Sequence, residues 1–423
     1  MPVVEDYLGV DKYDAPGWLG ARATRRFHVM VKPAGSACNL DCSYCFYLSK
    51  QALPGGPGGG HMSDEVLERF VRDYIQSVTA DEVVFSWQGG EPTLLGLGFF
   101  EKVVALQKKH AKPGQRIEND LQTNGTLLDE DWARFLKEHR FLVGLSIDGP
   151  REIHDHYRIT KRGEPTFDAV FAAAQALRKF KVPFNTLTCV HRFNASRPLD
   201  VYRFLRRELG STYLQFIPIV EPRDFETVAP QKGDPARLPV LGAPESRPDH
   251  PQSVVTPWSV DPDEYGYFLS KVWDEWLARD LGKVLVNFCE TLVVQRMGLP
   301  SQVCVYAENC GKGVALEHDG SVYSCDHYVY PEYRLGNVQQ ASLGDMVFAP
   351  RQVRFGYAKS ETLPAYCRQC DYLTDCWGEC PKNRLLRTPA GEPGLNYLCA
   401  GLKRFFRHAS PAANRIAKSL VRT

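Results

Sequence analysis

The sequence predicts an α/β fold in which helices cover a parallel sheet, followed by a smaller cysteine-rich region. Between residues 27 and 221, short runs of β-forming residues alternate six times with amphipathic helical segments. The polar motifs in this half directly follow the predicted strands, where parallel sheets bind their ligands. After Cys304 long apolar periodic segments become rare, and eight of the thirteen cysteines lie in this last part.

The alternation defines the expected elements in order. Ser63 is the expected N-cap of the first helix, whose apolar residues recur at helical spacing: Val66, Leu67, Phe70, Tyr74 and Ile75. The expected strands span residues 27–31, 83–87, 117–122, 141–147, 184–190 and 213–218. Further helices are expected near residues 99–110, 130–139, 168–180, 199–209, 265–278 and 287–297.

Composition shifts divide the chain into six parts. They are an irregular polar arm (1–25), the sheet-and-helix domain (26–221), a proline-rich loop or linker (222–260), connecting helices (261–300), the cysteine-rich domain (301–405) and a basic C-terminal tail (406–423). Eight prolines between residues 222 and 257 identify the loop. Because the cysteine-rich part has few long apolar segments, we expect bound metal to hold it together.

Charge and composition exclude several classes of protein. The 423 residues include 51 Lys and Arg against 50 Asp and Glu, so the net charge of +1 indicates neither a nucleic-acid nor a membrane partner. The first thirty residues contain no apolar signal-peptide segment, and no run approaches the roughly 18 apolar residues of a membrane span. Without an export signal, thirteen cysteines predict metal sites in a reducing cytoplasm rather than disulfides.

Three cysteines, Cys38, Cys42 and Cys45, share one short loop after the first predicted strand, with the spacing C-x3-C-x2-C. Soft thiolates on so short a loop favour an iron–sulfur cluster or zinc. Three ligands leave a four-metal cluster one ligand short, so that one iron stays open to a small molecule. Half of a zinc site is the competing interpretation.

Three further motifs follow predicted strands. In Gln88-Gly89-Gly90-Glu91-Pro92 the glycines allow the backbone to approach a ligand, and Glu91 offers an acceptor beside it. Asn124 and Ser146 end the third and fourth strands, and Ile217 lies at the end of the sixth. Taken singly, each motif is also compatible with an ordinary turn.

The second cysteine set runs Cys304-x5-Cys310-x14-Cys325, then Cys367-x2-Cys370-x5-Cys376-x3-Cys380, then Cys399. Its eight thiols suffice for two sites of four ligands each. Asp319-Gly320 between two short apolar runs predicts a hairpin that returns Cys325 toward Cys310. Zinc-ribbon sites are the competing interpretation. Cys189 and Cys289 are interpreted as ordinary buried thiols.

These motifs together resemble a known superfamily. The cysteine loop, flanked by Tyr44, Phe46 and Tyr47, and the Gly-Gly-Glu-Pro turn resemble radical S-adenosylmethionine (SAM) enzymes, and the second cysteine set resembles their SPASM domain. The chain further resembles anaerobic sulfatase-maturating enzymes, from about residue 27 to 408. The runs that carry this resemblance are His28-Val-Met-Val-Lys-Pro33, Trp87-Gln-Gly-Gly-Glu-Pro-Thr93, 215–221, Ser324-Cys-Asp-His327 and Gly394-Leu-Asn-Tyr-Leu-Cys399.

The resemblance implies a partial (β/α)6 barrel followed by a SPASM domain, with SAM and three 4Fe–4S clusters as cofactors. It assigns the SAM-binding cluster to Cys38, Cys42 and Cys45, one auxiliary cluster to Cys304, Cys310, Cys325 and Cys380, and the other to Cys367, Cys370, Cys376 and Cys399. The SAM or reaction-centre contacts that it implies are Tyr47, Gln88, Gly89, Gly90, Glu91, Asn124, Ser146, Arg158 and Ile217.

The implied activity is oxidation of a cysteine or serine, within the C/S-x-P-x-R motif of a nascent sulfatase, to Cα-formylglycine under anaerobic conditions. Asp326 is the expected general base, because it follows cluster ligand Cys325 and a base must reach the proton that it removes. Neighbouring cluster thiolates are expected to raise its pKa. An electron donor such as flavodoxin or ferredoxin is the second expected partner, and the chain is expected to act as a monomer.

Two other classes remain open at this point. A related enzyme would use the same cofactors to crosslink or otherwise mature a different ribosomal peptide. A non-enzymatic interaction protein would hold zinc with the same cysteines.

Overall fold

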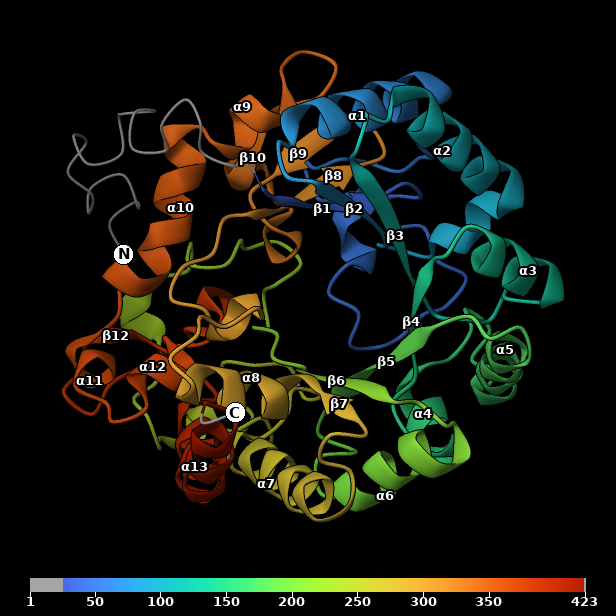
Figure 1. Ribbon diagram of the computed structural model, residues 1–423. Coiled ribbons are helices and arrows are strands. Elements are labelled where there is room, and N and C mark those ends of the chain that lie inside the picture. Colours follow the sequence, from blue (N-terminus) through green and yellow to red (C-terminus); the bar gives the residue numbers. More distant parts are fainter. Residues whose placement is uncertain (1–25, 422–423) are drawn as a thin grey trace.

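The computed structural model describes residues 26–421, and its centre is one ten-stranded sheet (Figure 1). The strand order is β10-β9-β8-β1-β2-β3-β4-β5-β6-β7. The strands are β1 (His28–Lys32), β2 (Glu82–Trp87), β3 (Arg116–Thr123), β4 (Leu142–Ser146), β5 (Phe184–Val190), β6 (Tyr213–Pro218), β7 (Leu285–Val286), β8 (Gly313–Glu317), β9 (Ser321–Tyr323) and β10 (Arg334–Asn337). A small second sheet pairs β11 (Leu386–Arg387) with β12 (Pro393–Leu395).

Helices connect the strands and form a ring outside the curved sheet (Figure 1). In the first half they are α1 (Asp64–Ser77), α2 (Gly96–His110), α3 (Glu130–Glu138), α4 (Arg151–Tyr157), α5 (Phe167–Lys179) and α6 (Pro198–Arg203). In the second half they are α7 (Pro262–Arg279), α8 (Asn287–Arg296), α9 (Leu343–Val347), α10 (Pro350–Glu361), α11 (Ala365–Arg368), α12 (Leu373–Cys376) and α13 (Cys399–Val421).

The predicted six-repeat parallel arrangement is confirmed. Strands β1 to β6 pair in parallel in chain order, and β7 continues the sheet in parallel with β6. Ser63 caps α1 as expected, because its Oγ accepts from the backbone N–H of Val66 at 3.3 Å. Helix α4 was not expected, since seven residues give too short a pattern to recognise.

The cysteine-rich region is joined to the barrel rather than separate from it. Strand β8 pairs in parallel with β1, placing Glu317 beside Lys32, and β9 returns antiparallel through the predicted turn at Asp319-Gly320. Val314 and Val322 are fully buried in the same core as barrel residues of β1 and β2. Shared strands and a shared apolar core therefore contribute to this region's stability, in addition to the metal that the sequence suggested.

The proline-rich loop is a packed surface element and not a free linker. Pro222 and Val255 form a bridge at its base, and Val240 pairs with Arg387 of β11. Val255 is fully buried in the main core. The described part of the expected basic tail belongs to α13, which runs without a break to Val421 and packs on α7. No helix within residues 26–421 is long and apolar enough to cross a membrane.

Helices α7 and α13 cross at two glycines. A Cβ atom on Gly401 would lie 1.8 Å from the carbonyl oxygen of Pro262, and one on Gly266 would lie 2.4 Å from the carbonyl oxygen of Gly401. Backbone atoms cannot move aside as a flexible side chain can, so only glycine permits this approach. The crossing fixes the start of α13, where Cys399 lies.

We expect Gly401→Ala to destabilise the protein, whereas Gly98→Ala in α2 should not. Overpacking against backbone costs about 1–3 kcal/mol, while Gly98 has no atom within 4 Å of the added methyl group. Removing a helical glycine there should instead stabilise by about 0.5–1 kcal/mol. Thermal unfolding of both variants measures the difference, and equal melting temperatures would contradict the close-crossing argument.

Candidate active site

The cysteine loop after β1 is held by hydrogen bonds to another segment and within the loop. The backbone N–H of Asp41 donates to the carbonyl of Ile159 at 2.9 Å, and that of Leu40 donates to Cys38 Sγ at 3.4 Å. Burial raises the pKa of the Cys38 and Cys45 thiols to about 11 each, and raises that of Cys42 as well. These thiols are therefore protonated near neutral pH. They must release their protons when they bind metal as thiolates.

The Gly-Gly-Glu turn after β2 packs directly on this loop. The backbone N–H of Glu91 donates to the carbonyl of Ala37 at 2.8 Å. Gly90 has φ of 47°, and a Cβ there would lie 2.1 Å from that same carbonyl oxygen. A Cβ on Gly89 would lie 1.9 Å from the Lys32 side chain. Gly90 is therefore required by the space that the Ala37 backbone leaves, and Gly89 is favoured by its φ of 78°.

The carboxylate of Glu91 is fully buried and fully hydrogen-bonded. Its Oε1 accepts from the backbone N–H of Thr93 at 3.0 Å, from Thr93 Oγ1 at 2.6 Å and from Thr123 Oγ1 at 2.7 Å. Its Oε2 accepts from the backbone N–H of Asn124 at 2.7 Å. A carboxylate has about four acceptor sites. Glu91 thus fastens the end of β2 to the end of β3, and little capacity remains for a ligand.

Asn124 and Ser146 lie at the carboxyl edge of the sheet, as the sequence predicts. Asn124 Nδ2 donates to Asn39 Oδ1 at 2.9 Å and lies 3.7 Å from Cys38 Sγ, so it orients the first cysteine. Ser146 Oγ is half-exposed and accepts from Gln122 Nε2 at 2.8 Å. Ile217 on β6 and Gln88 after β2 are also partly exposed at this edge.

Arg158 is buried in an ion pair that the sequence did not indicate. Its Nε donates to Asp148 Oδ2 at 2.9 Å and its Nη2 to Oδ1 at 3.2 Å. Tyr44 also donates to Asp148 Oδ2, at 2.5 Å. Although burial would raise the pKa of the Asp148 carboxyl, the Arg158 guanidinium lowers it overall. The same guanidinium lies close enough to Cys42 to oppose the burial-driven rise of that thiol's pKa.

Asp326 lies in a buried polar cluster at the end of β1. Its Oδ1 forms an ion pair with Lys32 Nζ, and the Lys32 ammonium lies 4.6 Å from the centroid of the Tyr47 ring. The Tyr47 hydroxyl in turn hydrogen-bonds to Glu317 on β8. Asp326 is therefore held beside the strand that leads into the three-cysteine loop, although 294 positions separate Lys32 from it in sequence.

The pKa of Asp326 is lowered, opposite to the rise that the sequence suggested. Burial alone would raise it, but the Lys32 ammonium, with smaller contributions from neighbouring groups that include Lys50, lowers the pKa overall. An ionised carboxylate is the form that accepts a proton. Burial lowers the pKa of neighbouring His327 to about 3, so its imidazole is neutral near pH 7.

Sequence reasoning missed several charged residues around Asp326. Lys50 is buried with its ammonium 3.5 Å from the centroid of the Tyr330 ring. Lys382 Nζ donates to Glu221 Oε1 at 2.5 Å. The one available signal was Lys32 itself, a lysine that ends an otherwise apolar strand. The others come from loops whose meeting depends on the tertiary fold.

The second cysteine set is divided between two places. Cys304 interacts electrostatically with Cys310, Cys325 and Cys380, which form the first group. Buried Lys359 holds the loop of Cys304, because its Nζ donates to the carbonyls of Cys304 and Val305 at 2.7 and 2.9 Å, and to that of Ala307. This lysine has no recognisable sequence motif.

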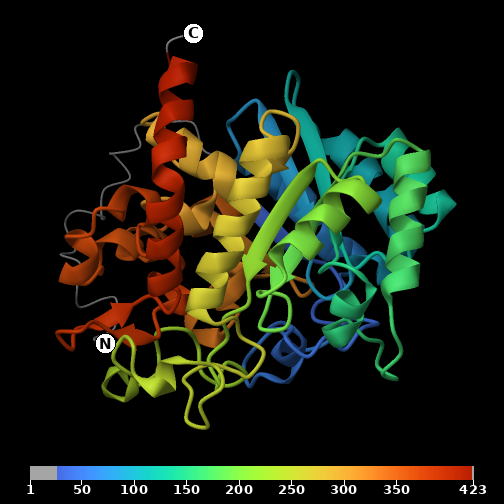
Figure 2. The same ribbon diagram turned by 90° about the horizontal axis from the view of Figure 1, so that it is seen from below.

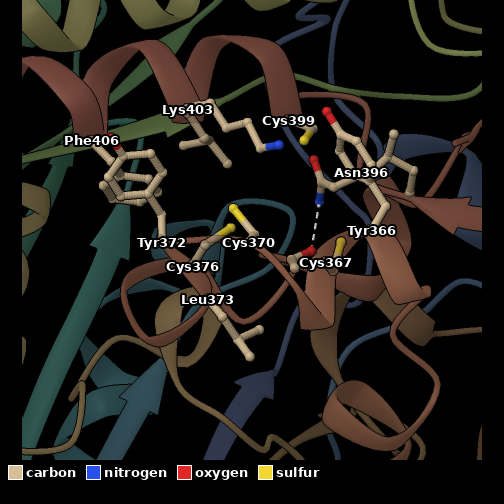
Figure 3. A pocket seen from close by; sticks show the side chains of 13 residues that line it. Tyr366, Cys367, Cys370, Tyr372, Leu373, Cys376, Asn396, Cys399, Lys403 and Phe406 are labelled. Atoms are coloured by element: carbon tan, nitrogen blue, oxygen red, sulfur yellow. Dashed lines mark hydrogen bonds between the residues drawn. The ribbon is translucent and has the colours of Figure 1, made fainter. Parts of the chain in front are cut away.

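The second group surrounds one mostly apolar cavity at the start of α13 (Figure 3). Sulfur atoms of Cys367, Cys370, Cys376 and Cys399 face this space. Cys376 and Cys380 belong to different groups, and the residues between them, Trp377, Gly378 and Glu379, all have positive φ. That strained turn reverses the chain and explains how neighbouring cysteines serve separate sites. Within residues 26–421, no three cysteine, histidine or carboxylate side chains are placed for a single metal ion.

Comparison with known families agrees with this geometry. The model of the radical SAM superfamily matches residues 33–205, and that of the SPASM iron–sulfur cluster-binding domain matches residues 304–371. Both matched regions contain cysteines of the groups described above.

Relatives match nearly the whole chain. A serine-type anaerobic sulfatase-maturating enzyme from Bacteroides thetaiotaomicron is 43% identical over 93% of this chain and 92% of its own. A cysteine-type enzyme from Clostridium perfringens is 35% identical over 93% of this chain and 98% of its own. The solved structure of native anSMEcpe with bound AdoMet and Cp18Cys peptide covers 93% of this chain and 99% of that one, at 35% identity and a TM-score of 0.77. Streptococcus suis SuiB with its precursor peptide SuiA, at 12% identity and a TM-score of 0.56, shares the fold.

Proposed function

The chain belongs to the anaerobic sulfatase-maturating enzymes, and from this premise we propose how its own residues carry out the family's reaction. It is a radical SAM enzyme that oxidises a cysteine or serine of a sulfatase to Cα-formylglycine, with SAM and 4Fe–4S clusters as cofactors. The observation that carries the assignment of roles is the buried pair of Lys32 and Asp326, which places a carboxylate beside the three-cysteine loop.

Cys38, Cys42 and Cys45 would hold the cluster that binds SAM, and the donor set fits, since three partly buried thiols share one loop. When bound, the reduced cluster and SAM would supply the abstraction of a hydrogen atom from the substrate β-carbon. The backbone of Gly89 and Gly90 is the favoured contact for the SAM amino group, because Glu91 is already saturated. Arg158 retains a free Nη1 for the SAM carboxylate beside Cys42.

Ser146 and Ile217 lie at the same edge of the sheet as Asn124 and complete the proposed cofactor contacts, with Gln88 and Tyr47 toward the substrate. Ser146 keeps a donor hydrogen, since its Oγ accepts from Gln122. Asn124 has its amide engaged with Asn39 and acts by positioning the cysteine loop. Each polar side chain is assigned to the cofactor only if it still has a hydrogen-bond donor or acceptor that no other protein group uses.

Asp326 is the proposed general base. Oxidation removes one electron and one proton from the substrate after hydrogen abstraction, and an ionised carboxylate beside the reacting carbon takes the proton. Lys32 keeps that carboxylate ionised and fixes its direction through the ion pair. The eight cysteines of the second set would hold two auxiliary clusters in the two groups described. The proposed substrate is an unfolded sulfatase segment, and the proposed electron donor is a flavodoxin or ferredoxin. The enzyme is proposed to act as a monomer in the cytoplasm.

A peptide assay tests this function. Anaerobic protein with reconstituted clusters, SAM and dithionite should convert a peptide with the C-x-P-x-R motif, and its serine counterpart, to the formylglycine product. Mass spectrometry detects this product. A matched peptide with alanine at the reacting position is the control. Formation of 5′-deoxyadenosine without formylglycine from either peptide, together with a crosslinked product from another peptide, would favour the alternative maturase.

A further inference from the structure

The exposed face of α13 is basic over its whole length. The helix contains no Asp or Glu, and its polar side carries Lys403, Arg404, Arg407, His408, Arg415 and Lys418, which we call the basic face. These residues recur at spacings of three, four and seven to eight positions, so they lie on one side. The opposite side is buried through Leu402, Phe405, Phe406, Ala409 and Ala413. Figure 2 shows α13 along the outside of the molecule.

Few partners neutralise this charge. Within residues 26–421, His408 pairs with Asp274 at 2.6 Å, and no ion pair involves Lys403, Arg404 or Arg407. The guanidinium of Arg404 lies 5.8 Å from the Tyr267 ring, and Lys271 of α7 lies 5.8 Å from the same ring, which adds another cation. Clustered cations of one sign attract acidic partners over distances of about 10 Å at moderate salt.

The basic face adjoins the cavity of the second cysteine group. A surface hollow of about 530 Å³ is lined by Arg404, Arg407, His408, Leu241 and Ala400, together with three residues that also line the cysteine cavity: Tyr366, Cys399 and Lys403. Figure 3 shows Lys403 reaching over the space toward which the sulfur of Cys399 points. One layer of side chains thus separates the hollow from the position that the four thiols would coordinate.

We propose that the basic face is the docking surface for a small acidic protein that carries one electron, such as a flavodoxin. The proposal rests on the proposed function, because formylglycine formation consumes one electron in splitting SAM and releases one when the substrate is oxidised. Docking places the carrier's redox centre against Tyr366, Cys399 and Lys403, the residues that line both the surface hollow and the cysteine cavity. The oxidised carrier gains the single electron that the cysteine-held centre loses, and no bond is made or broken.

The length of the surface favours a protein over a small anion. Residues 403–418 span about 22 Å of helix, far more than a phosphate or carboxylate occupies. Net charge for the whole chain is only +1, so the concentration of cations on this helix is local. A localised basic surface with few paired carboxylates suits a partner whose acidic residues are also gathered at one face.

Stopped-flow electron transfer tests the proposal. Reduced holoenzyme is mixed with an oxidised acidic flavodoxin, and the flavin absorbance is followed at several salt concentrations. We expect Arg404→Glu/Arg407→Glu to lower the rate constant about tenfold at low salt, and to remove its decrease with added salt. The matched control is Lys108→Glu/Lys109→Glu on α2, across the barrel from α13 (Figure 1), which makes the same change in net charge with little effect.

Three further results decide the interpretation. Dithionite-supported formylglycine formation should be unchanged in both variants, since a small reductant needs no docking surface. Its absence in the wild-type enzyme would count against the proposed function and not against docking. Equal rates and salt dependence in the wild-type and Arg404→Glu/Arg407→Glu proteins would overturn the docking proposal.

Discussion

Replacing Cys38, Cys42 and Cys45 together by alanine should leave about eight of about twelve irons per chain and abolish SAM cleavage. Three cubane clusters account for about twelve irons, and the two auxiliary groups lie on other segments of the chain. The triplet is the one cysteine group with three members, so it alone leaves an iron open to SAM. Iron and acid-labile sulfide analysis of anaerobically prepared protein measures the first outcome, and chromatography of 5′-deoxyadenosine the second.

Cys289→Ala is the matched control for this experiment. Cys289 is fully buried in the main core on α8 and belongs to none of the three cysteine groups, so its removal should change neither iron content nor SAM cleavage. Retention of about eight irons by the triple variant also shows that the rest of the chain has folded. Continued production of 5′-deoxyadenosine by the triple variant would refute the assignment of the SAM-binding cluster.

The second large effect separates hydrogen abstraction from proton removal. Asp326→Asn should still cleave SAM when peptide is present, yet form on the order of 10²–10⁴-fold less formylglycine, the usual loss for a general base. The amide keeps the size of the carboxylate but cannot accept a proton as a carboxylate does. Single-turnover reactions with a C-x-P-x-R peptide allow both products to be measured by mass spectrometry. Deuterium at the substrate β-carbon should still appear in 5′-deoxyadenosine.

The Asn substitution also removes the partner of Lys32, which leaves a buried ammonium without its counter-charge. The double variant Lys32→Met/Asp326→Asn removes both charges and serves as the control for that effect. If the base role holds, the double variant should show the same separation of SAM cleavage from formylglycine formation. A near-normal formylglycine yield from Asp326→Asn would instead move the base elsewhere, with neutral His327 as the next candidate.

Much of the barrel and the composition of the site follow from local signals. The alternation of β-rich and helical segments identifies the six parallel strands β1 to β6, and the Asp319-Gly320 turn identifies the β8–β9 hairpin. Side-chain periodicity and turn chemistry act within a few residues of the chain, so they can be read without knowing the fold. The short helix α4 escaped because seven residues do not establish a period.

The saturation of Glu91 and the charge state of Asp326 could not be read in this way. Glu91 is a candidate ligand by its motif, but its four hydrogen bonds come partly from Thr123 and Asn124 on another strand. The pKa of Asp326 has the opposite direction to the expectation, because Lys32 reaches it from β1. Both effects depend on which strands are neighbours in the sheet.

By itself the sequence determined which atoms are available for chemistry: three thiols on one loop, eight more in spaced groups, and a carboxylate beside one of them. Spacing along a short loop limits how far such groups can separate, which is why local motifs predict metal ligands well. The tertiary structure decided which groups are charged, saturated or free. It brings Lys32 to Asp326, Arg158 to Asp148 and the basic face of α13 to the second cysteine cavity. Electrostatic and hydrogen-bond energies depend on distance and burial in space, and residues far apart in sequence set both.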